Sequence, residues 1–399
     1  MKSKVVLAYS GGLDTSISIK WIKDKYNMDV IAALIDCGQP GNLKEVYQRA
    51  LDIGAVKSVI IDAKDEFIND FIFPSIKANL KYEKKYPLAT ALARPLIVKK
   101  LVEIAVKEGA KAVAHGCTAK GNDQVRFDVG IRSLSPDLKI ISPLREWSIS
   151  REESIEYAKK HNIKINVTKK DLYSIDENLW GRSIECGVLE DPWNEPPDDI
   201  YRWTKITKSS GESEYIEIEF NDGIPVSLNG ENIPPLMIIN KLNKAAGAYG
   251  IGRIDMVENR LVGIKSREIY ESPAAEIIIE AHRQLESLVL DRELIHYKYI
   301  LEEKLAELVY YGLWFTPLRK CLSAFINESQ NSVTGTVRIK LEKKNFEIVG
   351  RKSSYSLYDI DLATYEKGDK FDPKHSESFI KLWGYPYEIL GKKGRINGK

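Results

Sequence analysis

The fold is decided by the stretch Lys4-Val5-Val6-Leu7-Ala8-Tyr9-Ser10-Gly11-Gly12-Leu13-Asp14-Thr15-Ser16. Its first part, Lys4–Tyr9, is too short and too rich in β-branched residues for a helix, so it predicts a buried parallel strand. A helix is expected directly after the two glycines, with an apolar face formed within residues 17–22. Residues 14–16 are short and polar, and such side chains satisfy free N–H groups in a first helical turn.

A phosphate-binding site is expected at this turn. Gly11 and Gly12 let the backbone approach an anion closely, and a helix N-terminus adds unpaired N–H donors and a favourable dipole. The turn has neither the Gly-Lys-Ser/Thr of a Walker loop nor the G-x-G-x-x-G spacing of a dinucleotide fingerprint. Ser-Gly-Gly-x-Asp-Thr/Ser instead resembles the pyrophosphate loop of the N-type ATP pyrophosphatases, which cleave ATP between its α- and β-phosphates to adenylate a substrate. The alternative is an ordinary glycine-rich turn with Asp14 as a helix cap.

Composition predicts two or three domains, because 399 residues can bury a substantial core. Hydrophobic residues make up 43% of the chain, yet no uninterrupted apolar run approaches the length of a membrane span. Met1–Lys4 leads directly into the first strand, so no signal peptide is expected and the predicted location is the cytoplasm. The widely separated cysteines predict neither a zinc site nor disulfides. A formal charge of +2 gives no electrostatic footprint of a nucleic-acid-binding protein.

Strand-like and helix-like segments alternate from residue 1 to about 165, which predicts a parallel α/β sheet with helices on both faces. Ligands of such sheets bind beyond the carboxyl ends of the strands, so the turns after Tyr9 and Ile35 are expected on the ligand side, with adenine near Ile35. The further strands are expected at 29–36, 57–62, 111–115 and 139–143. The further helices are expected at 42–53, up to about 80, from after Pro95 to 106 with an amphipathic pattern, and from a Ser150–Glu153 capping box to about 161.

The segment Gly116–Phe127 follows the strand at 111–115 and is dense in polar groups. It contains two glycines, a hydroxyl, an amide, and the charged pair Asp123 and Arg126. A small zwitterionic ligand needs such a set of donors and acceptors at the carboxyl end of a strand. The alternative is a polar turn that caps the next helix, with Asp123 and Arg126 as a local ion pair.

The second half of the chain has a different pattern. Residues 165–200 are polar and loop-rich, which is typical of a linker or a functional loop. The remainder mixes strands and helices and so predicts an α+β domain with an antiparallel sheet. Hairpins are expected at 215–228, around Asn221-Asp222-Gly223, and at 336–349, and helices at 234–248 and 273–311. The predicted domains are 1–165, 166–365 and 366–399, the last an arm whose apolar residues need a partner.

Five segments together resemble the argininosuccinate synthase family: Ala8–Ser16, Tyr86–Pro95, Gly116–Phe127, Ser174–Gly187 and Gly250–Pro273. They follow the family's order and spacing over almost the whole chain. The strings His-Gly-Cys-Thr-Ala-Lys-Gly-Asn-Asp-Gln-Val-Arg-Phe and Gly-Arg-Ile-Asp-Met-Val-Glu-Asn-Arg are close to family signatures. The resemblance implies a Rossmann-like domain of the adenine nucleotide alpha hydrolase-like type, a synthetase domain, a C-terminal oligomerisation arm and a homotetramer.

The resemblance also implies a reaction of arginine biosynthesis. The ureido oxygen of citrulline attacks the α-phosphate of Mg-ATP and releases pyrophosphate, and the amine of aspartate then displaces AMP from the citrullyl-adenylate. Carried over by position, ATP is expected to bind at Ala8, Tyr9, Ser10, Gly11, Gly12, Leu13, Asp14, Thr15, Ser16, Ile35 and Gly116, with catalytic roles for Ser10 and Asp14. Citrulline is expected to bind at Tyr86, Thr90, Asn122, Arg126, Ser174, Ser183, Glu258 and Tyr270, and aspartate at Thr118, Asn122 and Asp123. No protein metal site is assigned, because Mg²⁺ arrives with ATP.

The residue types suit these roles. The planar fork of Arg126 matches the carboxylate of citrulline, whereas Glu258 and the hydroxyl of Tyr270 suit its ammonium or ureido N–H groups. One departure from the family stands next to Thr90. Many members carry Ser at the following position, where this chain has Ala91, so one hydroxyl contact to citrulline is absent.

Two alternatives remain open at this point. The first is a tRNA-thiolating or other nucleobase-modifying ATP pyrophosphatase, a class that usually shows a basic surface or a reactive cysteine pair, neither of which the charge and the cysteine spacing indicate. The second is a nucleotide-binding regulator without catalysis, which would not need the polar groups at 116–127 and 174–187. ATP–pyrophosphate exchange that depends on citrulline discriminates among these possibilities.

Overall fold

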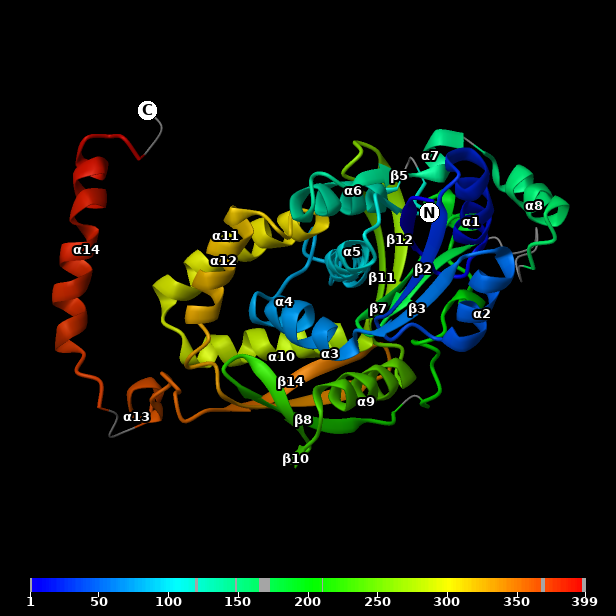
Figure 1. The fold of residues 1–399 in the computed structure, drawn as a ribbon. Helices are drawn as coiled ribbons and strands as arrows, with labels where there is room; N and C mark the ends of the chain where they lie inside the picture. Colours follow the sequence, from blue (N-terminus) through cyan, green and yellow to red (C-terminus); the bar gives the residue numbers. More distant parts are fainter. Residues whose placement is uncertain are drawn as a thin grey trace. The chain divides into compact units, whose positions relative to one another are not determined.

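The computed structural model describes residues 2–118, 121–147, 149–164, 173–209, 211–366 and 370–396. The chain forms two compact units, one that ends at Tyr355 and one that begins at Ser356 (Figure 1). Within the described residues, the first unit contains one parallel and two antiparallel sheets, and the second contains helices only.

The predicted parallel sheet is confirmed. Its strand order is β3-β2-β1-β4-β5, with every neighbouring pair parallel. Successive side chains of a strand point to opposite faces. In β1, Val6 therefore packs in the apolar cluster that contains Leu96, whereas Leu7 packs in the cluster that contains Ile19. The strands are β1 (Lys4–Ala8), β2 (Asp29–Asp36), β3 (Lys57–Asp62), β4 (Ala112–Ala114) and β5 (Lys139–Ile141).

Helices cover both faces of this sheet. Two of the expected helix starts have the side-chain caps that the sequence indicates: Asn42 accepts a hydrogen bond from the N–H of Lys44, and Ser150 and Glu153 form a complete capping box. The helices are α1 (Leu13–Tyr26), α2 (Leu43–Ile53), α3 (Lys64–Phe67), a π-helical turn (Ile68–Ile72), α4 (Phe73–Lys77), α5 (Ala89–Glu108), α6 (Asn122–Leu134), α7 (Pro143–Trp147) and α8 (Arg151–Lys160).

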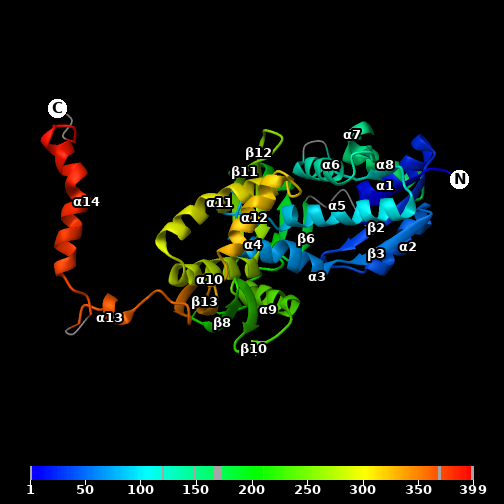
Figure 2. The same ribbon diagram turned by 60° about the vertical axis from the view of Figure 1, so that its left-hand side comes forward.

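Helix α5 corrects the sequence-based prediction in two ways. It begins at Ala89 rather than after Pro95, and Pro95 lies inside it. It is also buried around most of its circumference instead of along one face. The reason is its position: α5 runs along the parallel sheet beside α6 (Figure 2), and the strands β6 and β7 also pack against it. A helix enclosed in this way needs no polar face.

One antiparallel sheet has the strand order β10-β9-β8-β13-β14 and confirms both predicted hairpins. Asp222 and Gly223 both have positive φ, as a tight two-residue turn requires. The strands are β8 (Glu214–Asn221), β9 (Ile224–Leu228), β10 (Glu231–Asn232), β13 (Gly335–Glu342) and β14 (Asn345–Lys352).

A second antiparallel sheet, with strand order β11-β12-β7-β6, was not predicted. It includes part of the stretch that was expected to be a linker or loop, so that expectation is wrong for residues 174–185. The expected domain boundary at 165 lies outside the described residues. The strands are β6 (Ser174–Asn178), β7 (Gly181–Glu185), β11 (Arg253–Asn259) and β12 (Lys265–Glu271), and short 3₁₀ turns follow β7 at Gly187–Glu190 and Asp198–Ile200.

The helix expected at 273–311 is two helices, α10 (Pro273–Val289) and α11 (Arg292–Tyr310). The chain turns at Leu290, whose backbone is extended, and Asp291 then caps α11 by accepting hydrogen bonds from two backbone N–H groups. Helix α9 (Pro235–Ala248) lies where the sequence predicts it, and α12 (Pro317–Glu328) is an additional helix capped by Thr316.

The second unit contains α13 (Ile360–Ala363) and α14 (Lys374–Lys392). None of the residues of α14 is buried, although it carries eight large apolar side chains between Phe379 and Leu390. Among the described residues, no helix is both long enough and apolar enough to span a bilayer.

Candidate active site

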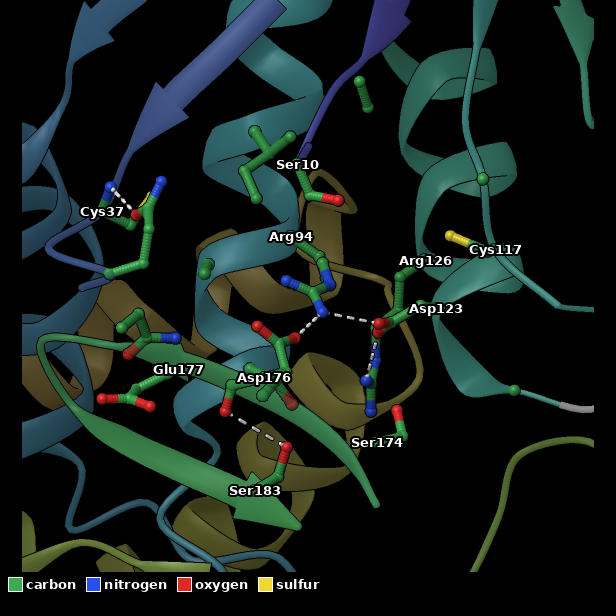
Figure 3. Close-up of a pocket in the computed structure, with 18 of the residues that line it drawn as sticks. Ser10, Cys37, Arg94, Cys117, Asp123, Arg126, Ser174, Asp176, Glu177 and Ser183 are labelled. Carbon is green, nitrogen blue, oxygen red and sulfur yellow. Dashed lines mark hydrogen bonds and ion pairs between the residues drawn. The ribbon is translucent and has the colours of Figure 1, made fainter. Parts of the chain in front are cut away.

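A cavity of about 630 Å³ lies at the carboxyl ends of β1, β2 and β4. Its walls come from the ends of the parallel sheet, from the sheet β11-β12-β7-β6, and from the helices α5, α6 and α11. Figure 3 shows Arg94 of α5, Asp123 of α6 and Asp176 of β6 around this space. Most predicted site residues line this cavity: Ala8, Tyr9, Ser10, Asp14, Thr15, Ile35, Tyr86, Thr90, Gly116, Thr118, Asn122, Asp123, Arg126, Ser174, Ser183, Glu258 and Tyr270.

Four residues of the first loop do not line the cavity: Gly11, Gly12, Leu13 and Ser16. Gly11 is buried with φ of +78°, and a Cβ there would lie 2.5 Å from Cγ1 of Val46. The glycine therefore lets the loop turn and pack against α2. Ser16 is wholly buried, 3.2 Å from the hydroxyl of Tyr9. These residues shape the loop rather than face the space it borders.

The start of α1 corrects the expectation that residues 14–16 cap the helix. The N-cap is Gly12, and no side chain caps it. The hydroxyl of Thr15 instead donates to the carbonyl of Gly12, and that of Ser10 lies 3.1 Å from Thr15. The first N–H groups of α1 thus lack side-chain caps, which is the condition that makes a helix N-terminus attractive to an anion.

Two further features of this end suit a nucleotide. Gly116 lies so close to α1 that a Cβ would be 2.8 Å from Cγ2 of Thr15, so the loop after β4 meets the start of α1 directly. Ile35 is buried at the end of β2 and lines the cavity together with Ala33 and Leu34, which gives a flat base an apolar surface. Burial raises the pKa of the Asp14 carboxyl, although Arg151 opposes this effect.

Tyrosines and Glu258 form the opposite wall. The rings of Tyr86 and Tyr270 stack with centroids 3.9 Å apart, and the hydroxyls of Tyr86 and Thr90 are 2.6 Å apart. Tyr270 donates a hydrogen bond of 2.7 Å to the carboxylate of Glu258. Burial raises the pKa of Glu258, while the hydrogen bonds from Tyr310 and Tyr270 favour its ionised form. Ala91 is wholly buried and does not line the cavity.

A chain of alternating charges crosses the middle of the cavity. Arg94 lies between Asp123, at 2.7 Å, and Asp176, and Arg126 bonds the other oxygen of Asp123 at 2.9 Å (Figure 3). Despite burial, which opposes ionisation, the two arginines hold the pKa of Asp123 well below its usual range. The predicted local pair of Asp123 and Arg126 is thus part of a larger network. Nη2 of Arg126 is buried without a hydrogen-bond partner among the described residues.

An acidic cluster lies beside the tyrosines. Arg260 bonds both Glu185 and Glu268, and all three side chains line the cavity. Burial, together with the charges of Glu185 and Glu258, raises the pKa of Glu268 to about 8. The bond from Arg260 opposes this rise, because it favours the ionised form of Glu268.

Sequence reasoning missed several lining residues, chiefly Arg94, Asp176, Glu185, Glu268 and Tyr310. Arg94 follows Thr90 by four residues on α5, so helical spacing alone pointed to the same face. The others lie in strands and a helix end whose place at the cavity depends on the unpredicted sheet and on the packing of α11. No local signal marks them.

The arrangement offers two kinds of surface. One end presents backbone N–H groups, hydroxyls and one carboxylate, as phosphates with a cation require. The other presents carboxylates, guanidinium groups and phenols, as zwitterionic amino acids require. Phosphoryl and amino-acid groups are therefore brought into one space, with no covalent nucleophile needed for transfer between them.

Comparison with known proteins agrees with this geometry. Residues 4–164 match the arginosuccinate synthase N-terminal HUP domain and residues 173–390 the arginosuccinate synthase C-terminal domain. The chain is 60% identical over 396 residues to the argininosuccinate synthase of Dictyoglomus thermophilum, covering 99% of both chains. It is 58% identical over 392 residues to that of Brevibacillus brevis, covering 98% of this chain and 94% of the other. A solved U34-tRNA thiolase from Methanococcus maripaludis is 17% identical, covers 42% of this chain and 60% of its own, and has a TM-score of 0.28.

Proposed function

The chain belongs to the argininosuccinate synthase family and is a ligase of that family, and we propose that the cavity described above holds ATP, citrulline and aspartate for both half-reactions. Citrulline first attacks the α-phosphate of ATP, and the amine of aspartate then displaces AMP. The observation that carries this proposal is the joining of the phosphate loop and the charged amino-acid wall in a single space. Family membership also sets aside the nucleobase-modifying enzyme and the catalytically inactive regulator.

ATP is assigned to the β1–α1 end of the cavity. The N–H groups of the first turn of α1 would meet the phosphates, Gly116 would border them from the loop after β4, and the backbone near Ile35 would hold adenine. Mg²⁺ fits this end because Asp14 is a carboxylate that lines the cavity beside the N-terminus of α1. Asp14 and the hydroxyl of Ser10 would hold the Mg-pyrophosphate group, and Mg²⁺ would neutralise charge on the leaving pyrophosphate.

Citrulline is assigned to the wall of Tyr86, Thr90, Arg126, Ser174, Ser183, Glu258 and Tyr270, which we name the citrulline subsite. The free Nη2 of Arg126 would donate to its carboxylate, and Glu258 would accept from its ammonium. The Thr90 hydroxyl is already within hydrogen-bond distance of Tyr86. A hydroxyl can donate one hydrogen bond and accept two, so Thr90 can still contact citrulline beside Ala91.

Aspartate is assigned to Thr118, Asn122 and Asp123, which we name the aspartate subsite; Asn122 also reaches citrulline. Asp123 carries negative charge, so it suits the ammonium of aspartate and not its carboxylates. Asn122 and Thr118 supply an amide and a hydroxyl for the carboxylates.

We expect Asp123→Asn to reduce the use of aspartate at least about ten-fold more than citrullyl-adenylate formation, because a neutral amide attracts the ammonium far less. Asn is preferable to Ala here, since its oxygen can still accept from Arg94 or Arg126. Positional isotope exchange in ATP, measured without aspartate, separates the two steps. The assignment fails if exchange falls as far as overall synthesis.

The activity itself is tested by omission. Purified protein with all three substrates is expected to release AMP and pyrophosphate in equal amounts and to form argininosuccinate, and omission of citrulline is expected to abolish all three products. Formation of AMP at the same rate without citrulline would contradict the proposal.

A homotetramer is the assembly that we propose. Support comes from α14, whose large apolar side chains from Phe379 to Ile389 are exposed and need another surface to cover them. In a tetramer with three perpendicular two-fold axes, the α14 of each subunit would pack on a neighbouring subunit in an equivalent way. The three-domain division and the cytoplasmic location stay predictions.

Deletion from Ser378 onward is expected to shift the particle to dimers or monomers in light scattering, because the deletion removes most of α14. The first unit is expected to stay folded, as thermal unfolding with and without ATP can verify. A truncated protein that stays tetrameric at low concentration would show that α14 does not hold the assembly together.

A further inference from the structure

Tyr310, the last residue of α11, lies at the meeting point of the residues assigned to the two amino acids. It is wholly buried, and it lines the cavity. Its ring stacks on Tyr82 with centroids 3.6 Å apart, and the guanidinium of Arg126 lies 4.8 Å from the ring centroid. These two contacts fix the plane of the ring and hence the position of the hydroxyl.

The hydroxyl of Tyr310 joins Asn122 to Glu258. It accepts a hydrogen bond of 2.8 Å from Nδ2 of Asn122 and donates one to the carboxylate of Glu258. Burial and the nearby charge of Glu258 raise the pKa of Tyr310, so the phenol keeps its proton. The direction of both bonds is therefore set. The other side of the Asn122 amide is held as well, because Oδ1 accepts from the N–H of Leu261 at 2.8 Å.

The backbone of Tyr310 holds a third group. Its carbonyl accepts a hydrogen bond of 2.8 Å from Nε of Arg126. Two residues later, Gly312 has φ of +75°, and a Cβ there would lie 2.8 Å from Cα of Arg126. The end of α11 thus packs directly on α6, and the glycine permits this approach. The carbonyl of Tyr310 and the carboxylate of Asp123 together fix the orientation of the Arg126 guanidinium.

We propose that Tyr310 is a positioning residue that couples the citrulline and aspartate subsites. One hydroxyl fixes Asn122, which serves aspartate, and Glu258, which serves citrulline, while the carbonyl of the same residue fixes Arg126. This proposal rests on the proposed function of the cavity. Tyr310 needs no contact with substrate to act in this way, because it acts through the groups that it orients.

Tyr310→Phe tests the proposal, since it removes the hydroxyl and keeps the ring between Tyr82 and Arg126. We expect the KM for citrulline and the KM for aspartate each to rise about ten-fold, as loss of a hydrogen bond to a charged or tightly held polar group implies. The KM for ATP is expected to stay within about two-fold of the original value, because no bond of the hydroxyl reaches the phosphate loop.

Tyr311→Phe is the matched control. Tyr311 is the neighbouring residue, its ring contacts Tyr82 and Tyr310 edge-on, and it does not line the cavity. All three KM values are expected to be unchanged in this variant. A Tyr310→Phe enzyme whose KM rises for citrulline alone or for aspartate alone would overturn the coupling, and equal rises for all three substrates would indicate general disruption and overturn it as well.

The pH profile provides a readout that a merely structural role would not change. The charged groups around Glu258 are Arg126, Arg260 and Glu268, and Tyr270 and Tyr310 donate to it. Tyr310→Phe removes one donor that favours the carboxylate, so the pKa of Glu258 rises. The acid limb of kcat/KM for citrulline is therefore expected at higher pH in the variant. An acid limb at unchanged pH would contradict the link to Glu258.

A double-mutant cycle makes the test independent of small changes in stability. In a Glu258→Gln background, Tyr310→Phe is expected to raise the KM for citrulline less than it does alone, because part of its effect passes through the carboxylate. If the effects of the two substitutions on the KM for citrulline are fully additive, Tyr310 does not act through Glu258. Citrulline-dependent ATP–pyrophosphate exchange by the unaltered protein tests the proposed function separately, since its absence would refute that function whatever the variants do.

Discussion

Asp14→Asn is expected to lower citrullyl-adenylate formation by at least about 100-fold, the size of effect seen when one group that stabilises developing charge is removed. Asp14 is the only carboxylate that the first turn of α1 brings to the cavity, in the part of the chain that the structure describes. An amide in its place would keep the shape and lose the charge that draws Mg²⁺ to the pyrophosphate. Single-turnover formation of AMP from ATP and citrulline measures the loss.

The same substitution is expected to lower activity without lowering the stability of the folded protein. Burial raises the pKa of Asp14 in the folded protein, so its ionised form is less favourable there than in the unfolded chain. The destabilisation is present above the folded pKa and disappears as the pH falls below the unfolded one. At neutral pH without Mg-ATP, Asp14→Asn is therefore expected to raise Tm or leave it unchanged. Near-normal turnover by the folded variant would refute the role of Asp14.

The control for this substitution lies on the same helix. Asp24 is exposed in α1, where it pairs with Lys20 four residues earlier. Asp24→Asn removes a carboxylate from α1 far from its N-terminus, so the rate of AMP formation and its dependence on Mg²⁺ are expected to be unchanged. A similar loss in both variants would mean that the charge of the helix as a whole matters, and not the place of Asp14.

Arg126→Lys is expected to raise the KM for citrulline roughly 30-fold or more, because breaking a desolvated charge pair costs about 2–5 kcal/mol. Arg126 is buried and donates through Nε to the carbonyl of Tyr310 and through Nη1 to Asp123, which leaves Nη2 for the substrate. Lysine keeps the charge but has a single nitrogen in place of the fork. A lysine therefore cannot bond the carbonyl of Tyr310, Asp123 and the substrate at the same time.

Initial rates at varied citrulline and fixed ATP measure this effect, and the KM for ATP is expected to change little. Arg132→Lys is the control, because Arg132 is exposed near the other end of α6. An unchanged dependence on citrulline in Arg126→Lys would remove Arg126 from the citrulline subsite.

The first half of the fold could be predicted from sequence because its signals are local. Residues 30–35 form a continuous apolar run, and Asn42 and Ser150 are caps, so each of these elements is indicated within a few residues. In the second half, the turn pair Asp222-Gly223 is an equally local signal. The helix break at Leu290 was missed although Asp291 is an N-cap residue, because apolar residues on both sides continue a helical pattern.

The β6–β7 hairpin could not be predicted in the same way. Its strand Ser174–Asn178 contains no run of apolar residues, because it lines the cavity. The other edge of β7 pairs with β12, which lies far along the chain and gives no local signal. The roles of Arg94 and Tyr310 at the cavity could not be predicted for a similar reason. Their partners lie on other elements, Asp176 for Arg94 and Glu258 for Tyr310, so only tertiary packing shows what they contact.

The measurement that tests the account most directly is exchange of labelled pyrophosphate into ATP in the absence of aspartate. With citrulline present, the purified protein is expected to catalyse exchange, because the first half-reaction is reversible while the citrullyl-adenylate stays in the cavity. Without citrulline, exchange is expected to be absent. Exchange of equal rate with and without citrulline, or no exchange in a preparation that binds ATP, would contradict the central claim that phosphate loop and amino-acid wall form one adenylating site.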